Sequence, residues 1–116
     1  MNRFNIFNQN MPALSLDKEQ LACLVYDVLS PNVTSFEFGN LLSTIARNCV
    51  RDGIGLPKDA MTEYNEILDG KDKVRIREII WDLIVLRYVT IGDYHNDSWP
   101  HLTVTELGKK SIGSNC

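Results

Sequence analysis

The chain has 116 residues, 44% of them hydrophobic and 23% charged, which is ordinary for a single globular domain. No apolar run approaches the roughly 20 residues that a membrane-spanning helix needs, and residues 1–15 lack the apolar core of a secretory signal. We therefore expect a cytoplasmic protein with no membrane partner. The net charge of −3 at pH 7 argues against non-specific nucleic-acid binding through bulk positive charge, but not against a local basic patch.

Residues 1–14 are rich in asparagine, with Phe4, Ile6 and Phe7 interleaved. We expect an arm that is either flexible, because chain termini fray unless they are docked, or docked through its two phenylalanines on the domain or on a partner. The domain itself is expected to span residues 15–116.

Hydrophobic periodicity and turn residues predict the next elements. In chain order we expect a helix at 16–29 capped by Ser15, a short strand at 33–36, a helix at 38–50, a loop at 51–57 and a short helix at 58–68. Asp69 and Gly70 would close the last of these, because glycine commonly follows a helix end.

The longest amphipathic segment, residues 71–88, is predicted to be a helix. On a helix with about 100° per residue, Ile76, Leu83 and Ile84 lie within roughly 60° of Ile80. Further apolar residues widen this surface to more than half of the circumference: Ile79, Val74, Trp81 and Tyr88. We therefore expect the helix to be sandwiched between other elements. The strip left for solvent would comprise Lys71, Arg75, Glu78 and Asp82.

A change of period follows this helix. Residues 88–91 and 101–105 alternate apolar and polar side chains, as half-buried strands do, and residues 92–100 between them are rich in turn formers. This predicts a two-stranded hairpin. Thr105 would then cap a short helix at 106–111.

The sequence WDLIVLRYVTIG, followed by WPHLTVTELGKK, resembles winged helix-turn-helix proteins. In that family the last helix runs into the first wing strand, and the second strand ends in a Leu-Thr-x-x-Gly-type sequence before a closing helix. The matching residues are Leu83, Ile91, Leu102, Thr105 and Gly108. The resemblance implies a mostly helical α+β fold with a C-terminal two-stranded wing and an extra N-terminal helix. Residues 58–68 and 71–88 would form the helix-turn-helix.

The resemblance also implies a DNA-binding module, such as a small bacterial-type transcriptional regulator that is often a dimer. Such proteins place the last helix in the major groove, so the candidate contacts to double-stranded DNA are Lys71, Lys73, Arg75 and Arg77. Glu78 and Asp82 would repel phosphates, however, and residues 92–101 contain two aspartates and no Lys or Arg.

The alternative is a winged helix that binds protein instead of DNA, as an adaptor or a dimerisation module. Its candidate contacts are Phe4, Phe7 and Trp99, because exposed aromatic side chains are enriched at protein interfaces. For Trp99 a second interpretation stays open, namely that it covers the apolar face of the hairpin.

No pattern predicts catalysis, a metal site or a cofactor. The one cluster of ligand-type side chains, Asp93, His95, Asp97 and His101, lacks a standard zinc spacing and is better explained as a solvated wing tip. The three cysteines are widely spaced and include no CxxC pair. An enzyme is therefore not expected.

Overall fold

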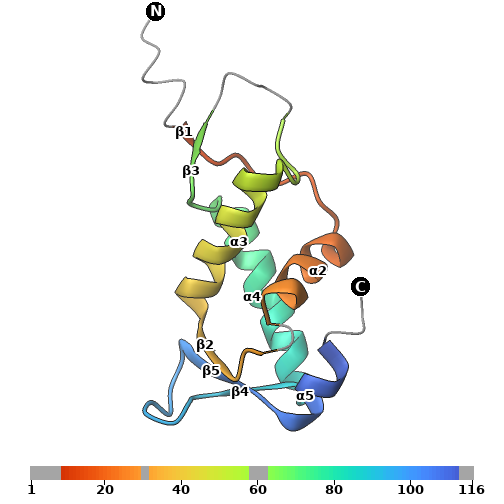
Figure 1. Cartoon of the computed structure of the whole chain (residues 1–116), viewed down its shortest axis with the longest axis vertical. Helices are drawn as coiled ribbons and strands as arrows, with labels where there is room; N and C mark the ends of the chain where they lie inside the picture. The colour runs from red at the N-terminus through yellow and green to blue at the C-terminus, as the bar shows by residue number, and fades with distance from the viewer. Residues whose placement is uncertain (1–8, 30–31, 58–62, 113–116) are drawn as a thin grey trace, which may run out of the picture.

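The computed structural model describes residues 9–29, 32–57 and 63–112. Over these ranges the fold is α+β, with four helices and a small antiparallel sheet (Figure 1). The elements are β1 (Gln9–Asn10), α2 (Lys18–Leu29), β2 (Ser35–Glu37), α3 (Phe38–Asp52), β3 (Tyr64–Asn65), α4 (Gly70–Val85), β4 (Val89–Ile91), β5 (His101–Val104) and α5 (Glu106–Ser111). No helix in the described ranges is long and apolar enough to cross a membrane.

The predicted hairpin is confirmed, and β2 adds a third strand to it. The strand order is β2-β5-β4, with both neighbouring pairs antiparallel. Leu102 at the centre of β5 lies opposite Phe36 on one side and Ile91 on the other. Leu102 and Val104 are buried while His101 and Thr103 are half-buried, which is the alternation expected of a strand with one face on the core. The sheet lies at one end of the molecule, next to the ends of α3 and α4 (Figure 1).

The hydrophobic core forms where the helices and the sheet meet. α2 packs against both α3 and α4, whereas α3 and α4 pack less closely on each other. The side chains at the centre are almost fully buried: Leu21 and Val25 of α2, Leu41 and Ile45 of α3, Ile76, Ile80 and Leu83 of α4, and Leu102 of β5. Cys49 is also buried, as a free thiol, and burial raises its pKa to about 11.

Both ends of α4 differ from the prediction. The helix begins at Gly70 because the Asp69 carboxylate accepts the Lys71 backbone N–H at 3.0 Å, so Asp69 caps this helix instead of closing an earlier one. It ends at Val85, not at residue 88. Arg87 adopts a left-handed conformation with φ 64°, and the Tyr88 N–H returns to the Leu83 carbonyl at 2.9 Å, which is how many helices terminate.

The start of α2 also differs from the prediction, because Asp17 and not Ser15 caps it. The Gln20 backbone N–H donates to Asp17 Oδ1 at 2.8 Å, and the Asp17 N–H donates to Gln20 Oε1 at 2.9 Å. This reciprocal pair is a capping box, which satisfies two backbone donors that a helix start otherwise leaves without partners.

The predicted helix at 58–68 is wrong over the residues that the structure describes, which begin at 63. Tyr64 and Asn65 form β3, which pairs in parallel with β1, and the Asn65 side chain donates to Asn10 Oδ1 at 3.0 Å. Residues 66–69 are irregular. A short apolar pattern such as that of Tyr64, Ile67 and Leu68 cannot distinguish a helix from an extended segment. The helix before α4 is therefore α3.

Part of the predicted N-terminal arm belongs to the packed domain. Met11 and Leu14 are 3% and 5% exposed and lie in the core, so the packing begins before residue 15. The Leu14 backbone N–H donates to Asp72 Oδ2 at 2.7 Å. Phe4 and Phe7 lie outside the described residues. A truncation that preserves the core should therefore leave Met11 and Leu14 in place.

Candidate interaction surface

The outward face of α4 carries three exposed apolar side chains in a row. Val74 is 52% exposed, Trp81 45% and Val85 80%, and helical geometry sets them within about 40° of one another. We call these three residues the outer stripe. The prediction of a helix sandwiched between other elements is therefore wrong for this face, because all three side chains stay exposed in the described part of the chain. The buried face, which includes Ile76, Ile79, Ile80 and Leu83, is as predicted.

Aromatic rings connect the outer stripe to the core. The rings of Trp81 and Trp99 are stacked, with centroids 6.1 Å apart and planes at 12°. Trp99 also contacts Phe38 at the start of α3, with centroids 5.0 Å apart. Phe38 is buried and Trp99 is half-buried. Trp99 therefore packs on the domain and holds the Trp81 ring against it, and Trp81 presents the more exposed indole of the two.

Arg75, a predicted DNA contact, is occupied inside the domain. Its guanidinium Nη2 donates to the Leu16 carbonyl at 2.5 Å, and Nη1 lies 3.4 Å from Asp72 Oδ1. The side chain is 33% exposed, so it does not stand on a solvent strip. Asp72 is fully buried, and a buried carboxylate needs partners of this kind. Together, Arg75 and Asp72 attach residues 14–16 to α4.

The other three predicted DNA contacts on α4, Lys71, Lys73 and Arg77, are exposed. Lys73 and Arg77 lie on the side of the outer stripe that faces α3, and among the described residues no ion pair involves either of them. This side of α4 therefore carries two uncompensated positive charges.

The two exposed acidic residues of α4, Glu78 and Asp82, lie on the opposite side of the outer stripe and are partly neutralised. Lys18 Nζ lies 3.2 Å from Glu78 Oε1 and 2.9 Å from Asp82 Oδ2. These carboxylates raise the pKa of the lysine. Exposed ion pairs of this kind add little stability, but they reduce the negative charge that Glu78 and Asp82 present to a partner. The repulsion of an anionic partner is correspondingly weaker than the sequence suggests.

The loop between β4 and β5 is organised by Asp93. Its Oδ1 accepts the backbone N–H groups of His95 at 2.8 Å and Asn96 at 2.9 Å, and these bonds lower its pKa. Its Oδ2 lies 3.3 Å from His101 Nδ1. Tyr94 at the tip is fully exposed. The carboxylate therefore shapes the loop, and residues 92–101 contain no Lys or Arg that could meet a phosphate backbone.

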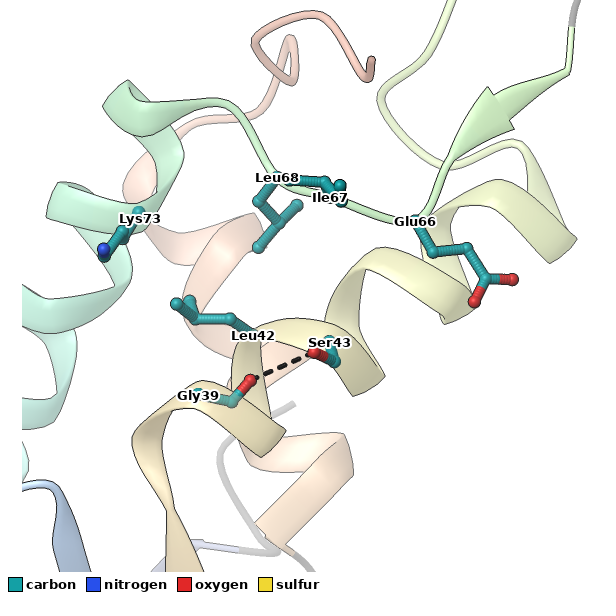
Figure 2. A pocket seen from close by; sticks show the side chains of 7 residues that line it. All are labelled: Gly39, Leu42, Ser43, Glu66, Ile67, Leu68 and Lys73. Atoms are coloured by element: carbon teal, nitrogen blue, oxygen red, sulfur yellow. Dashed lines mark hydrogen bonds between the residues drawn. The ribbon is translucent and has the colours of Figure 1, made fainter. Parts of the chain in front are cut away.

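A groove lies between α3 and the start of α4 (Figure 2). Its volume is about 230 Å³, and its lining residues are Gly39, Leu42, Ser43, Glu66, Ile67, Leu68 and Lys73. In Figure 2, Leu42 and Leu68 lie between Lys73 on one side and Glu66 on the other. Ile67 is 61% exposed, and Glu66 forms an ion pair with Arg47 at 3.5 Å. The sequence did not reveal this groove, because residues 66–68 were predicted to be helical.

No known protein family matches the chain, and no curated protein or solved structure matches it at a significant level. The outer stripe, the two unpaired cations and the groove adjoin one another on the α3–α4 side of the molecule. Of the aromatic residues predicted to bind a protein, Trp99 lies at this surface.

Proposed function

We propose that the chain is a cytoplasmic protein-binding module built on a winged helix, and that its partner docks on the outer stripe of α4. The order α2-β2-α3-β3-α4-β4-β5-α5, in which β3 is outside the three-stranded sheet, and the sheet order β2-β5-β4 support the winged-helix part of the proposal. In this assignment α3 and α4 are the helix-turn-helix pair, β4 and β5 are the wing, and α5 is the closing helix.

The observation that carries the proposal is the exposure of Val74, Trp81 and Val85 in one row. Scattered exposed apolar residues are normal, but apolar side chains gathered on one face commonly mark a protein contact. Tryptophan is among the residues that most often dominate the binding energy of an interface. Trp81 is also held in place by its stack on Trp99, so less side-chain entropy is lost when a partner covers it.

Binding of double-stranded DNA by the same helix is the second candidate, and it is favoured by the exposure of Lys71, Lys73 and Arg77. In this candidate function Arg75 does not contact DNA and only stabilises the fold, through its bonds to Leu16 and Asp72. Random duplex DNA should then be retarded at low salt. Lys73→Ala should make the log-affinity against log-salt plot shallower by about 0.9. If Lys73→Ala leaves the slope of this plot unchanged, this face of α4 does not bind DNA.

The protein-binding proposal is tested by comparing two charge-introducing variants in affinity purification from the cells that express the chain. Val74→Glu combined with Val85→Glu should reduce the recovered partner at least tenfold, because two carboxylates would have to be buried without partners. Tyr94→Glu, at the fully exposed wing tip, is the matched control and should leave recovery unchanged. Both variants should keep the free energy of unfolding within about 0.5 kcal/mol of wild type. Equal recovery with the double variant and the wild type would contradict the proposal.

A further inference from the structure

One ridge of α4 links the groove to the outer stripe. Lys73, Arg77, Trp81 and Val85 follow one another at intervals of four residues, and side chains spaced in this way form a continuous ridge on a helix. Lys73 at one end of the ridge lines the groove. Trp81 and Val85 at the other end belong to the outer stripe. A partner lying along the ridge would meet an apolar groove, then two cations, then an apolar patch.

The positive charges in the middle of this surface are the ones that lack partners within the described ranges. Glu66 at the far side of the groove is paired with Arg47, and Glu78 and Asp82 across the outer stripe are paired with Lys18. The net charge that a partner meets along the ridge is therefore positive, from Lys73 and Arg77. Electrostatic complementarity between binding surfaces favours a partner with carboxylates at that point.

The dimensions of the surface also restrict the partner. The distance along α4 from Lys73 to Trp81 is about 12 Å, at 1.5 Å per residue, so it matches about two turns of a second helix. The groove, at about 230 Å³, is smaller than the roughly 300–1,000 Å³ of typical small-molecule sites. It suits one large apolar side chain, such as those that anchor helices bound in grooves.

We infer that the partner segment is an acidic amphipathic helix lying along the Lys73–Val85 ridge. One apolar side chain enters the groove beside Leu42 and Leu68, and a second, about seven residues away, covers Trp81. Aspartate or glutamate side chains between them meet Lys73 and Arg77. This inference rests on the proposed protein-binding function and specifies the chemistry of the partner.

The test is a selection of random 16-residue peptides displayed on phage against the full chain. Wild-type protein should enrich peptides with two large apolar residues about seven apart and acidic residues between them. Lys73→Glu combined with Arg77→Glu should instead enrich basic residues at the central positions. Lys109→Glu combined with Lys110→Glu makes the same charge change on α5 and should leave the acidic preference intact. The inference would be overturned if wild-type protein enriched no peptides or enriched peptides without acidic residues. It would also be overturned if the variant with Lys73→Glu and Arg77→Glu enriched the same acidic peptides as wild type.

A groove-filling variant tests where the selected peptides bind. Ser43 lines the groove, and its side chain is exposed at a helix position, where its hydroxyl donates only to the Gly39 carbonyl of its own helix at 3.2 Å (Figure 2). Ser43→Phe should therefore leave the fold intact and weaken peptide binding at least tenfold, whereas Thr90→Phe on the wing should not weaken it. If Ser43→Phe binds the selected peptides as tightly as wild type does, the peptides do not occupy the groove. The placement would also be contradicted if random duplex DNA, added without any other competitor, displaced the peptide from the wild-type protein.

The selection and the purification experiment fail independently. If Val74→Glu with Val85→Glu abolishes partner recovery while the selection yields no acidic motif, the protein-binding function stands and the acidic helix is wrong. If the double variant recovers as much partner as wild type and the selection yields no acidic motif, both proposals are wrong.

Discussion

Leu83→Ala should lower the free energy of unfolding by about 2–5 kcal/mol, the usual result of emptying a core site. Leu83 is 1% exposed and lies among the buried residues of α2, α4 and β5, so the side chain removed would leave a cavity. Urea unfolding followed by circular dichroism measures the change, and the midpoint should fall without a change in the slope of free energy against urea.

The control for this substitution lies two residues along the same helix. Val85→Ala removes an apolar side chain that is 80% exposed, so it should alter the free energy of unfolding by no more than about 0.5 kcal/mol. Similar losses from Leu83→Ala and Val85→Ala would mean that the helix faces are assigned incorrectly.

Gly108→Ala should cost about 3 kcal/mol, the upper end of the usual range for overpacking. A Cβ atom at this position would overlap the Tyr88 backbone carbonyl oxygen, which is not the end of a flexible side chain and cannot turn away. The start of α5 would therefore have to move away from Tyr88, which lies in the connection between α4 and β4. The Gly108 N–H also donates to Thr105 Oγ1 at 2.9 Å as part of the helix cap, so the shift would strain that bond too.

Gly70→Ala is the matched control for Gly108→Ala. A Cβ atom at residue 70 would meet no heavy atom within 4 Å, and alanine favours the helical conformation over glycine by about 1 kcal/mol in a helix interior, less at a helix start. Thermal unfolding should therefore show a melting temperature that is unchanged or higher for Gly70→Ala and clearly lower for Gly108→Ala. A melting temperature for Gly108→Ala equal to that of wild type would contradict the close approach of α5 to Tyr88.

Leu102, Thr105 and Gly108, spaced Leu-x-x-Thr-x-x-Gly in the sequence, each have a physical explanation in the fold. Leu102 fills the core from the central strand. The Thr105 hydroxyl accepts the Gly108 N–H and donates to the Arg87 carbonyl at 2.7 Å. Gly108 allows α5 to approach the backbone of Tyr88. The alternation along the strands and the Thr105 cap involve only residues close in the sequence, which is why the hairpin and the closing helix could be predicted from residue types and spacing.

Periodicity could not decide which apolar residues of α4 are exposed. It gives the angles between side chains on a helix, but the arc that is covered depends on which elements pack there. Val74 and Trp81 extended the predicted apolar surface and are exposed instead. A signal was nevertheless present, because an apolar arc wider than half a helix exceeds what neighbours in a domain of 116 residues readily cover.

Long-range polar contacts were also beyond prediction. Arg75 has the same charge as Lys73 and Arg77, but its partners include the Leu16 carbonyl, 59 residues away in the sequence. The burial of Asp72 likewise depends on the Leu14 N–H, 58 residues away. Hydrophobic spacing carries no information about such pairs. Separating the exposed cations of α4 from the internal one required the three-dimensional structure.

The most direct test of the central claim, that the outer stripe of α4 is a protein-binding face, is a site-specific photo-crosslinking scan in the expressing cells. A photoreactive phenylalanine derivative replaces Val74, Trp81 or Val85 in turn, and the reference positions are the exposed Glu19 of α2 and Arg51 of α3. We predict a discrete, protease-sensitive adduct from the three positions of the outer stripe and none from the two reference positions. Nuclease-sensitive adducts, equal yields at all five positions, or no adduct from the outer stripe would contradict the claim.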